Sequence, residues 1–262
     1  MYSMDESVFL GWEAGVRKVG KPGFVKGAYE MIVRERDFGY LLIKQHDHGW
    51  VSGEFAAHWR EKFHPWSRTE LAIRYHDAGW DVLDKNIRWN PNTGRPFSFV
   101  DYPLEEKLPA YRQGIDRVEA KDTFAACLCS MHYASFFRDA REEESIRFLK
   151  REERRRKRLR STFSERDREC LADGLRLLKL CDDLSLFVCL NEPGRNDHPW
   201  YRNGFRYGEQ TLFPVWRERN RLGIHPNPFD GDFEVEIPYL LIDSDGEEME
   251  RDRYRIRISG SD

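Results

Sequence analysis

The chain lacks the long apolar runs that mark membrane proteins. None of its 262 residues lies in a run near the roughly 18 apolar residues that a membrane-spanning helix needs. The first ten residues carry Asp5 and Glu6, where a secretory signal peptide needs positive charge. We therefore expect a cytoplasmic protein with no membrane partner.

A strong charge bias is also missing. The net charge is only -3 although 34% of the residues are charged, so the chain as a whole attracts neither nucleic acid nor an anionic membrane. The most basic stretch, residues 150–160, is nearly balanced by acidic neighbours and has no aromatic side chain for base stacking. It predicts a solvated helix face with intrahelical ion pairs, and we expect no nucleic-acid partner.

Cysteine is too scarce and too irregularly placed for a disulfide framework. The five cysteines are odd in number and lie on apolar helical patterns, which favours reduced core thiols. Cys127 and Cys129 could together bind a metal, but no second pair accompanies them. The core interpretation is the better supported one.

Hydrophobic periodicity divides the chain into three parts. Residues 1–27 show no clear period and form an N-terminal segment, residues 28–225 are dominated by helical patterns, and residues 226–262 alternate with period two, as half-buried strands do. A β-hairpin over residues 29–44 opens the middle part. The sequence therefore predicts a mainly α fold, a helical bundle with a small sheet. In this sheet the C-terminal strands pack on the helical domain and pair with the hairpin.

One segment between the predicted helices has a different composition. Residues 81–109 are rich in proline, asparagine, glycine and aromatic residues and contain no helical period. Ordered loops of this length inside a compact domain are usually functional. We therefore expect this loop to contribute to a site.

Three ionisable residues interrupt apolar helix faces. His48 shares a helical stripe with Val51 and Phe55, and His132 lies between Leu128 and Phe136 on another helix. Asp182 stands in the middle of a long stripe of the last predicted helix, which contains Leu171, Leu175, Leu178, Ser185 and Cys189. A lone carboxylate there would be strongly penalised, so it needs a cation or several hydrogen-bond donors.

Two adjacent ionisable residues add to these three. His76 and Asp77 are adjacent at the end of a predicted helix. Each residue alone is compatible with a core histidine or a buried carboxylate that accepts backbone hydrogen bonds. Together, imidazoles and carboxylates from several helices favour one or two divalent transition-metal ions such as Mn, Fe or Zn.

The order of these residues resembles the HD superfamily of metal-dependent phosphohydrolases. That superfamily has a His on a first helix, an adjacent His-Asp pair closing a second, and an Asp on a late helix. His48, His76-Asp77 and Asp182 match these parts in order. The resemblance implies an HD-like helical bundle.

A second resemblance covers about residues 28–240. The chain looks like a bacterial family of domains of unknown function, number three-eight-nine-one, whose pattern is HD-like and whose activity is not established. The matching motifs are Gln45-x-Asp47-His48, His76-Asp77-Ala78-Gly79-Trp80, Thr93-Gly94-Arg95-Pro96, Phe99-Val100-Asp101-Tyr102-Pro103, Ser130-Met131-His132-Tyr133 and Asp182-Asp183-Leu184-Ser185-Leu186.

These resemblances imply roles for individual residues. They imply His48, His76, Asp77 and Asp182 as metal ligands, with Asp77 also orienting the attacking water. His132 would bind a second metal or contact a phosphate. The loop residues Asp84, Arg95 and Asp101 are candidates for contacts that support the metal ligands or bind the substrate, with Arg95 able to hold a phosphate through two hydrogen bonds. The alternative for Asp84 and Asp101 is that they only cap turns.

Three functions remain open on this basis. The first is a hydrolase that uses metal-activated water on a small phosphorylated metabolite or nucleotide. The second is a di-iron oxygenase, which would need His132 and a further ligand such as His46 or His58. The third is a non-catalytic module that binds a metal or a ligand, with Trp80 and Trp89 as its recognition surface. The oligomeric state stays undetermined.

Overall fold

A computed structural model describes residues 31–85 and 87–260 of the chain. The predicted N-terminal segment 1–27 and the first residues of the predicted hairpin lie outside the described residues. No helix in the described ranges is both long and apolar enough to cross a bilayer.

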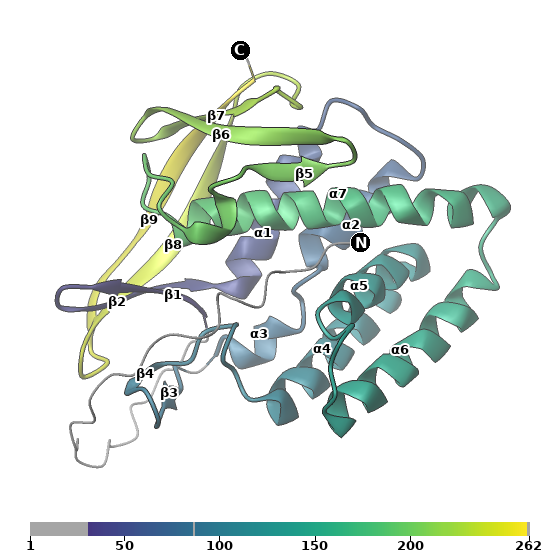
Figure 1. Ribbon diagram of the computed structural model, residues 1–262, viewed down its shortest axis with the longest axis horizontal. Helices are drawn as coiled ribbons and strands as arrows, with labels where there is room; N and C mark the ends of the chain where they lie inside the picture. The colour runs from purple at the N-terminus through teal and green to yellow at the C-terminus, as the bar shows by residue number, and fades with distance from the viewer. Residues whose placement is uncertain (1–30, 86, 261–262) are drawn as a thin grey trace.

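The helices gather on one side of the molecule and around its centre (Figure 1). The last helix is much the longest and reaches from the helical side to the sheet. In chain order the helices are α1 (Gln45–Ala57), α2 (Trp66–Tyr75), α3 (Trp80–Leu83), α4 (Leu104–Glu119), α5 (Thr123–Ser135), α6 (Glu143–Arg160) and α7 (Glu165–Leu190), with the 3-10 helix η2 (Pro199–Tyr201).

The strands form one large sheet and one small ribbon. The sheet has seven strands in the order β1-β2-β8-β9-β7-β6-β5, and all its pairings are antiparallel except β7 with β9. Its strands are β1 (Met31–Arg36), β2 (Gly39–Lys44), β5 (Phe205–Tyr207), β6 (Gln210–Glu218), β7 (Arg221–His225), β8 (Phe233–Asp243) and β9 (Glu248–Ser259). The two-stranded ribbon, β3 (Trp89–Asn90) with β4 (Arg95–Pro96), lies within the predicted functional loop.

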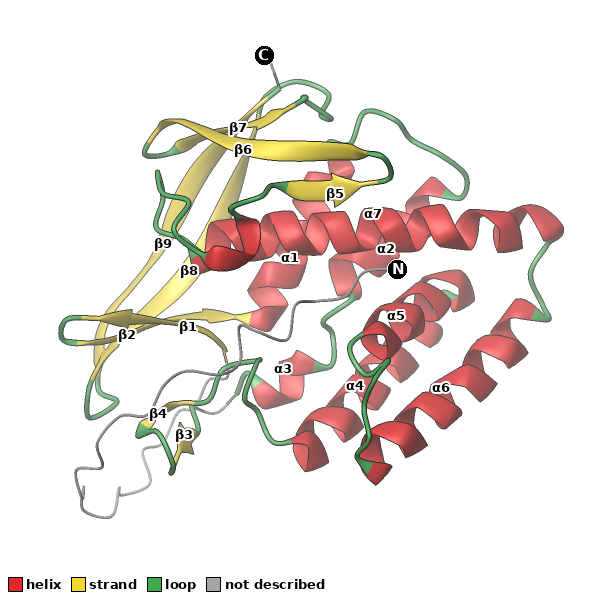
Figure 2. Ribbon diagram, viewed as in Figure 1, coloured by secondary structure: helices red, strands yellow, loops and turns green. Residues whose placement is uncertain are grey.

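The prediction of a mainly α helical bundle with a small sheet is wrong. About 45% of the described residues are in helices and 26% in strands, and the sheet curls into a half-barrel. Figure 2 shows that the strands of the large sheet occupy one side of the molecule, and the helices lie beside them. The hairpin does join the C-terminal strands, because β2 pairs with β8. The sheet that results is large enough to change the fold class.

The error arises mainly in residues 205–225, where β5, β6 and β7 lie in a segment expected to be helical. The strand β6 contains Pro214, a residue that argues against a strand with partners on both sides. The structure tolerates it because β5 pairs only with residues 210–212, so Pro214 lies beyond the end of that pairing. On its other side Pro214 is in register with Ile224 of β7.

Helices and sheet share one hydrophobic core. Phe55 of α1, Ile73 of α2 and Leu184 of α7 are fully or almost fully buried in the same cluster as Val235 of β8 and Ile256 of β9. The helix α1 lies between the sheet and the other helices, packing on α2, α7 and β8. Polar side chains on the inner faces of α1 and α7 therefore meet in the middle of the molecule.

Candidate metal centre

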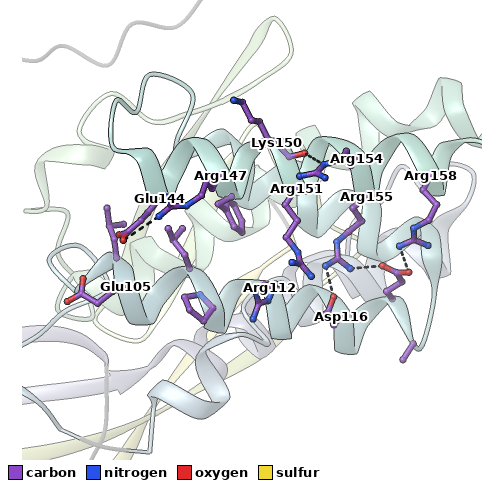
Figure 3. A pocket seen from close by; sticks show the side chains of 16 residues that line it. Glu105, Arg112, Asp116, Glu144, Arg147, Lys150, Arg151, Arg154, Arg155 and Arg158 are labelled. Atoms are coloured by element: carbon purple, nitrogen blue, oxygen red, sulfur yellow. Dashed lines mark hydrogen bonds and ion pairs between the residues drawn. The ribbon is translucent and has the colours of Figure 1, made fainter.

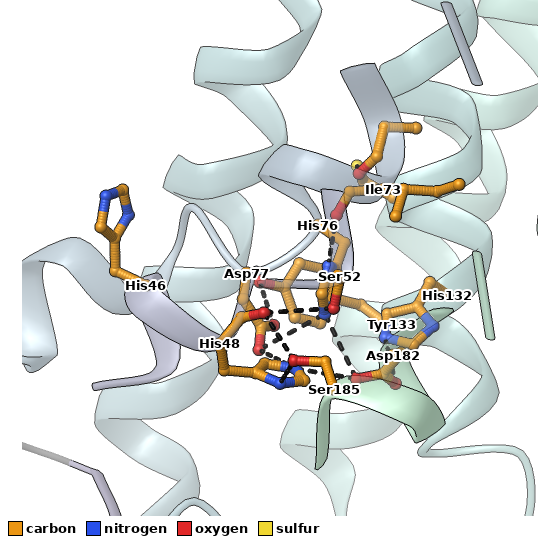
Figure 4. Close-up of polar contacts among 12 residues, drawn as sticks. His46, His48, Ser52, Ile73, His76, Asp77, His132, Tyr133, Asp182 and Ser185 are labelled. Carbon is orange, nitrogen blue, oxygen red and sulfur yellow. Dashed lines mark hydrogen bonds and ion pairs between the residues drawn. The ribbon is translucent and has the colours of Figure 1, made fainter. Parts of the chain in front are cut away.

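Four elements bring ionisable side chains to one point in the core (Figure 4). His48 comes from α1, His76 directly follows α2, His132 comes from α5, and Asp182 comes from α7. Each of the three imidazoles is only 1% exposed. We call these four residues and Asp77 the His–Asp centre.

The turn after α2 holds His76 and Asp77 in place through close backbone packing. Gly79 follows the pair, and a Cβ atom on Gly114 of α4 would lie 2.3 Å from the backbone nitrogen of Gly79. A Cβ atom on Gly79 would in turn lie 2.7 Å from the carbonyl oxygen of Ala110. Larger residues at either glycine would push α4 away from the turn that carries the centre.

The distances in the centre converge on one carboxylate oxygen. Oδ1 of Asp182 lies 2.9 Å from Nε2 of His48 and 3.3 Å from Nε2 of His76. The second oxygen of Asp182 is 3.4 Å from Nε2 of His132. Asp77 stands slightly further away, with Oδ2 at 3.8 Å from His48 Nε2 and 3.6 Å from His76 Nε2.

Hydrogen bonds on the far side of two rings fix which nitrogen carries a proton. Nδ1 of His76 lies 2.7 Å from the carbonyl oxygen of Ile73, to which it donates. Ser185 Oγ donates to the carbonyl oxygen of His48 at 2.8 Å and lies 2.6 Å from Nδ1 of the same residue. A hydroxyl has only one proton, so Ser185 accepts from Nδ1. In both neutral rings the lone pair of Nε2 then points at Asp182.

Lone pairs of two imidazoles that face one carboxylate require positive charge between them. Without a metal, protons supply it: although burial alone lowers the pKa of His76, the charges of Asp77 and Asp182 raise it to about 9. Burial raises the pKa of Asp182, but the hydrogen bonds and charges of the histidines bring it well below its usual value. A cation that binds here replaces those protons.

The donor set fits a divalent transition metal. One ligand atom each of His48, His76 and Asp182 lie within 4.8 Å of one another. Nε2 of His76 is buried and makes no hydrogen bond of good geometry with the described residues. Two imidazole nitrogens and a carboxylate oxygen are ligands that Zn, Fe and Mn all accept. The structure brings together three of the four predicted ligands, with Asp77 next to them, and their binding of a metal stays a prediction.

Two further groups border the centre. Burial lowers the pKa of His132 to about 3, which keeps that ring neutral. Its Nδ1 makes no hydrogen bond with the described residues. Tyr133, the next residue, donates from its hydroxyl to Oδ1 of Asp77 at 3.3 Å. Burial raises the pKa of Asp77.

The two loop carboxylates have hydrogen-bond partners of different kinds. Asp84 is buried, and its Oδ2 accepts from the backbone nitrogen of His46 at 2.9 Å, which caps the start of α1 from outside the helix. Asp101 accepts from the backbone and the hydroxyl of Ser98 at 2.7 and 2.8 Å, and from Asn90 at 2.9 Å. The contacts of Asp101 match the capping alternative, and the structure does not bring this residue to the centre. Asp84 does not cap a turn of its own loop, because it accepts from the start of α1, 38 residues earlier in the sequence.

The remaining candidates also lie apart from the centre. Arg95 is half exposed and forms an ion pair with Glu35 at 2.9 Å. His46 points away from the centre in Figure 4 and lies 2.6 Å from Asp81. The ring of His58 stacks on Phe233 at 4.0 Å between centroids. Neither histidine is therefore placed as the extra ligand that a di-iron site would need.

The sequence interpretation did not assign roles to Ser185 and Tyr133, which contact the centre directly. Ser185 lies on the same helical stripe as Asp182, three residues later, and Tyr133 follows His132 in a quoted motif. The signal for Ser185 was present as a small polar residue on an apolar stripe. Its partner on another helix could not be read from the sequence.

Comparison with known proteins places the chain in a family. No curated protein and no solved structure matches it. Residues 31–244 match a family model described as protein of unknown function, DUF3891, which confirms the resemblance to family three-eight-nine-one. The likeness to the HD superfamily has no support from these comparisons and rests on the pattern of residues alone. Because the family model covers most of the chain, the protein belongs to the DUF3891 family.

Proposed function

We propose that the protein is a metal-dependent hydrolase of the HD type that acts on a small phosphorylated metabolite or nucleotide. The observation that carries this proposal is the convergence of three ligand atoms whose lone pairs face one buried point, on His48, His76 and Asp182. One or two ions of Mn, Fe or Zn suit this donor set.

The three ligand residues would hold the ion, and Asp77 would complete the set. A divalent ion there supplies Lewis acidity, which makes hydroxide accessible at neutral pH and screens the charge of a phosphoryl group. Ser185 and the carbonyl oxygen of Ile73 keep the two imidazoles in the tautomer that binds a cation.

Asp77 is suited to accept a proton from the attacking water. Tyr133 orients one of its oxygens by donating at 3.3 Å, while the other oxygen faces His48 and His76. Burial raises the pKa of Asp77, which brings the carboxylate closer to the working pH of a general base.

His132 is suited to contact the substrate or a second ion. Its ring is neutral because burial lowers its pKa to about 3. Nε2 faces Asp182 at 3.4 Å, and Nδ1 is unpaired among the described residues. A neutral ring with an unpaired nitrogen can ligate a second ion or, in its other tautomer, donate to a phosphoryl oxygen.

The partial exposure of the two carboxylates favours a catalytic site over a purely structural one. The side chains of Asp77 and Asp182 are 9% and 13% exposed, whereas those of His48 and His76 are nearly sealed at 1% and 0%. The carboxylate side of the centre therefore borders solvent. Structural metal sites are closed, and catalytic ones keep an open position.

The test is a metal count followed by an activity screen. Protein purified with and without oxygen is analysed for metals, and the loaded protein is assayed with Mn on a panel of phosphomonoesters and nucleotides. We expect bound metal and turnover in the unaltered protein, no bound metal in His76→Ala, and normal loading in His46→Ala. A protein that binds no metal contradicts the proposal.

Two other outcomes would point to the remaining functions. A pair of irons with oxygen consumption would indicate the oxygenase, in spite of the positions of His46 and His58. Bound metal without turnover across the whole panel would indicate a non-catalytic metal-binding module.

A further inference from the structure

A basic groove runs between α4 and α6, away from the His–Asp centre (Figure 3). It has a volume of about 1150 Å³, and no residue of the centre lines it. Seven arginine or lysine residues and four acidic residues line the groove. This local excess of positive charge occurs in a chain whose net charge is -3.

Part of the positive charge is neutralised by ion pairs that build the walls of the groove. Arg155 bridges from α6 to Asp116 and Glu119 of α4, and Arg158 also pairs with Glu119. Arg147 pairs with acidic residues of its own helix. These pairs tie the two helices together and hold the groove open in one shape.

Four further cations in the groove have no acidic partner in the described part of the chain. Arg112 comes from α4, and Lys150, Arg151 and Arg154 come from α6. Arg154 uses Nε to donate to the carbonyl oxygen of Lys150 at 3.2 Å, which leaves the rest of its guanidinium unpaired. Arg151 extends from α6 toward α4 in Figure 3. Like charges on one helix face repel one another, and an anion bound among them would remove that repulsion.

We propose that this groove binds a small anion that carries several phosphates in a row. Arg151 and Arg154 lie three residues apart on α6, and Arg151 extends toward α4, which carries Arg112, so a ligand between the two helices must offer several negative charges close together. Neighbouring phosphates linked by a single oxygen provide that density. Arginine matches phosphate through paired hydrogen bonds, and Arg112 adds a contact from the opposite wall.

Two other polyanions fit less well. Single-stranded nucleic acid needs aromatic platforms, and the one aromatic residue in the lining, Phe148, is only 6% exposed. An extended acidic peptide presents side chains on one face only about every 6.6 Å, which spaces its charges more widely than these cations.

The experiment is calorimetric titration of the full chain with tripolyphosphate at physiological salt. EDTA is present so that a metal at the His–Asp centre does not contribute to binding. We expect one binding site in the unaltered protein. Arg112→Gln/Arg151→Gln should weaken the affinity at least about 10-fold, because two charge-assisted contacts are lost. Arg154→Gln, which removes one contact, should weaken it less.

Arg166→Gln is the matched control. Arg166 is an exposed arginine of α7 that lies outside the groove lining, so the substitution removes the same charge elsewhere. Its affinity should stay within about twofold of the unaltered protein. Thermal unfolding of each variant identifies any that fail to fold, and if the double variant does not fold, the Arg154→Gln result carries the test.

Three results would overturn the inference. They are no binding of tripolyphosphate by the unaltered protein, an equal loss in Arg166→Gln, and tighter binding of oligothymidylate, hexaglutamate or anionic vesicles than of tripolyphosphate. The inference does not rest on the proposed hydrolase. If the protein binds no metal at the His–Asp centre, the inference about the groove is unaffected. If tripolyphosphate does not bind, the proposed metal centre is unaffected.

Discussion

The His–Asp centre and the loop over residues 81–109 both carry polar residues that the sequence marks as candidates, yet the fold uses them differently. In the centre, buried imidazoles and carboxylates from four elements face one another. In the loop, Asp84 and Asp101 hold nearby backbone and side-chain groups. A polar residue on an apolar helix stripe has to find a distant partner, whereas Asp101 finds its partners within the loop at little cost. Asp84 is an intermediate case, because it lies in the loop but accepts from the distant start of α1.

Asp182→Asn should produce the largest loss of metal affinity, because Asp182 is the carboxylate that both His48 and His76 face. The amide keeps the shape of the side chain but cannot balance positive charge beside His48 and His76. We expect metal affinity to fall by more than the roughly 100-fold seen when only an outer partner of a ligand is lost. Calorimetric titration with Zn or Mn measures the change, and near-normal affinity would remove Asp182 from the ligand set.

Ser185→Ala should have the next largest effect, because it releases the ring of His48. The variant loses the 2.6 Å contact to Nδ1 and the 2.8 Å hydrogen bond to the carbonyl oxygen. Outer partners of this kind typically contribute 10–100-fold to metal affinity. We expect a loss in that range, measured by the same titration.

Ser52→Ala provides the control for this variant. Ser52 also donates to the carbonyl oxygen of His48, at 3.2 Å, but in the described structure its hydroxyl makes no hydrogen bond with the ring. Its loss should leave metal affinity within about threefold of the unaltered protein. Equal losses in Ser52→Ala and Ser185→Ala would mean that the backbone of α1, rather than the tautomer of His48, determines binding.

The centre was more predictable from the sequence than the fold around it. His48, His132 and Asp182 were identified because each interrupts an apolar stripe, a signal that depends only on local helical geometry. The sheet depends on pairings between distant segments, such as Leu41 of β2 with Leu241 of β8, and helical periodicity carries no information about them. Ser185 was missed for the same reason, since its partner lies on another helix.

Asp101→Ala tests the loop side of the comparison. Asp101 accepts three hydrogen bonds, from Ser98 and Asn90, so its removal should lower the free energy of unfolding by about 1–3 kcal/mol. Metal affinity should not change. Urea denaturation measures the loss, with the exposed Asp139→Ala as the control that should change stability by less than about 0.5 kcal/mol. A fall in metal affinity would connect the loop to the centre.

Arg95→Ala should have the smallest effect. Arg95 and Glu35 are 44% and 53% exposed, and ion pairs at such positions contribute only about 0–1 kcal/mol. A double-mutant cycle with Glu35→Ala, followed by urea denaturation, measures that coupling, which should shrink further at high salt.

The same variant also decides whether the comparison between centre and loop holds for substrate recognition. If Arg95 only pairs with Glu35, the KM for any phosphoester that the protein hydrolyses should stay within about twofold in Arg95→Ala. A phosphate held by two hydrogen bonds from a guanidinium would instead lose roughly 10-fold or more in affinity without it. A KM increase of that size would give Arg95 a direct role in binding substrate, because the weak ion pair with Glu35 contributes too little to produce it.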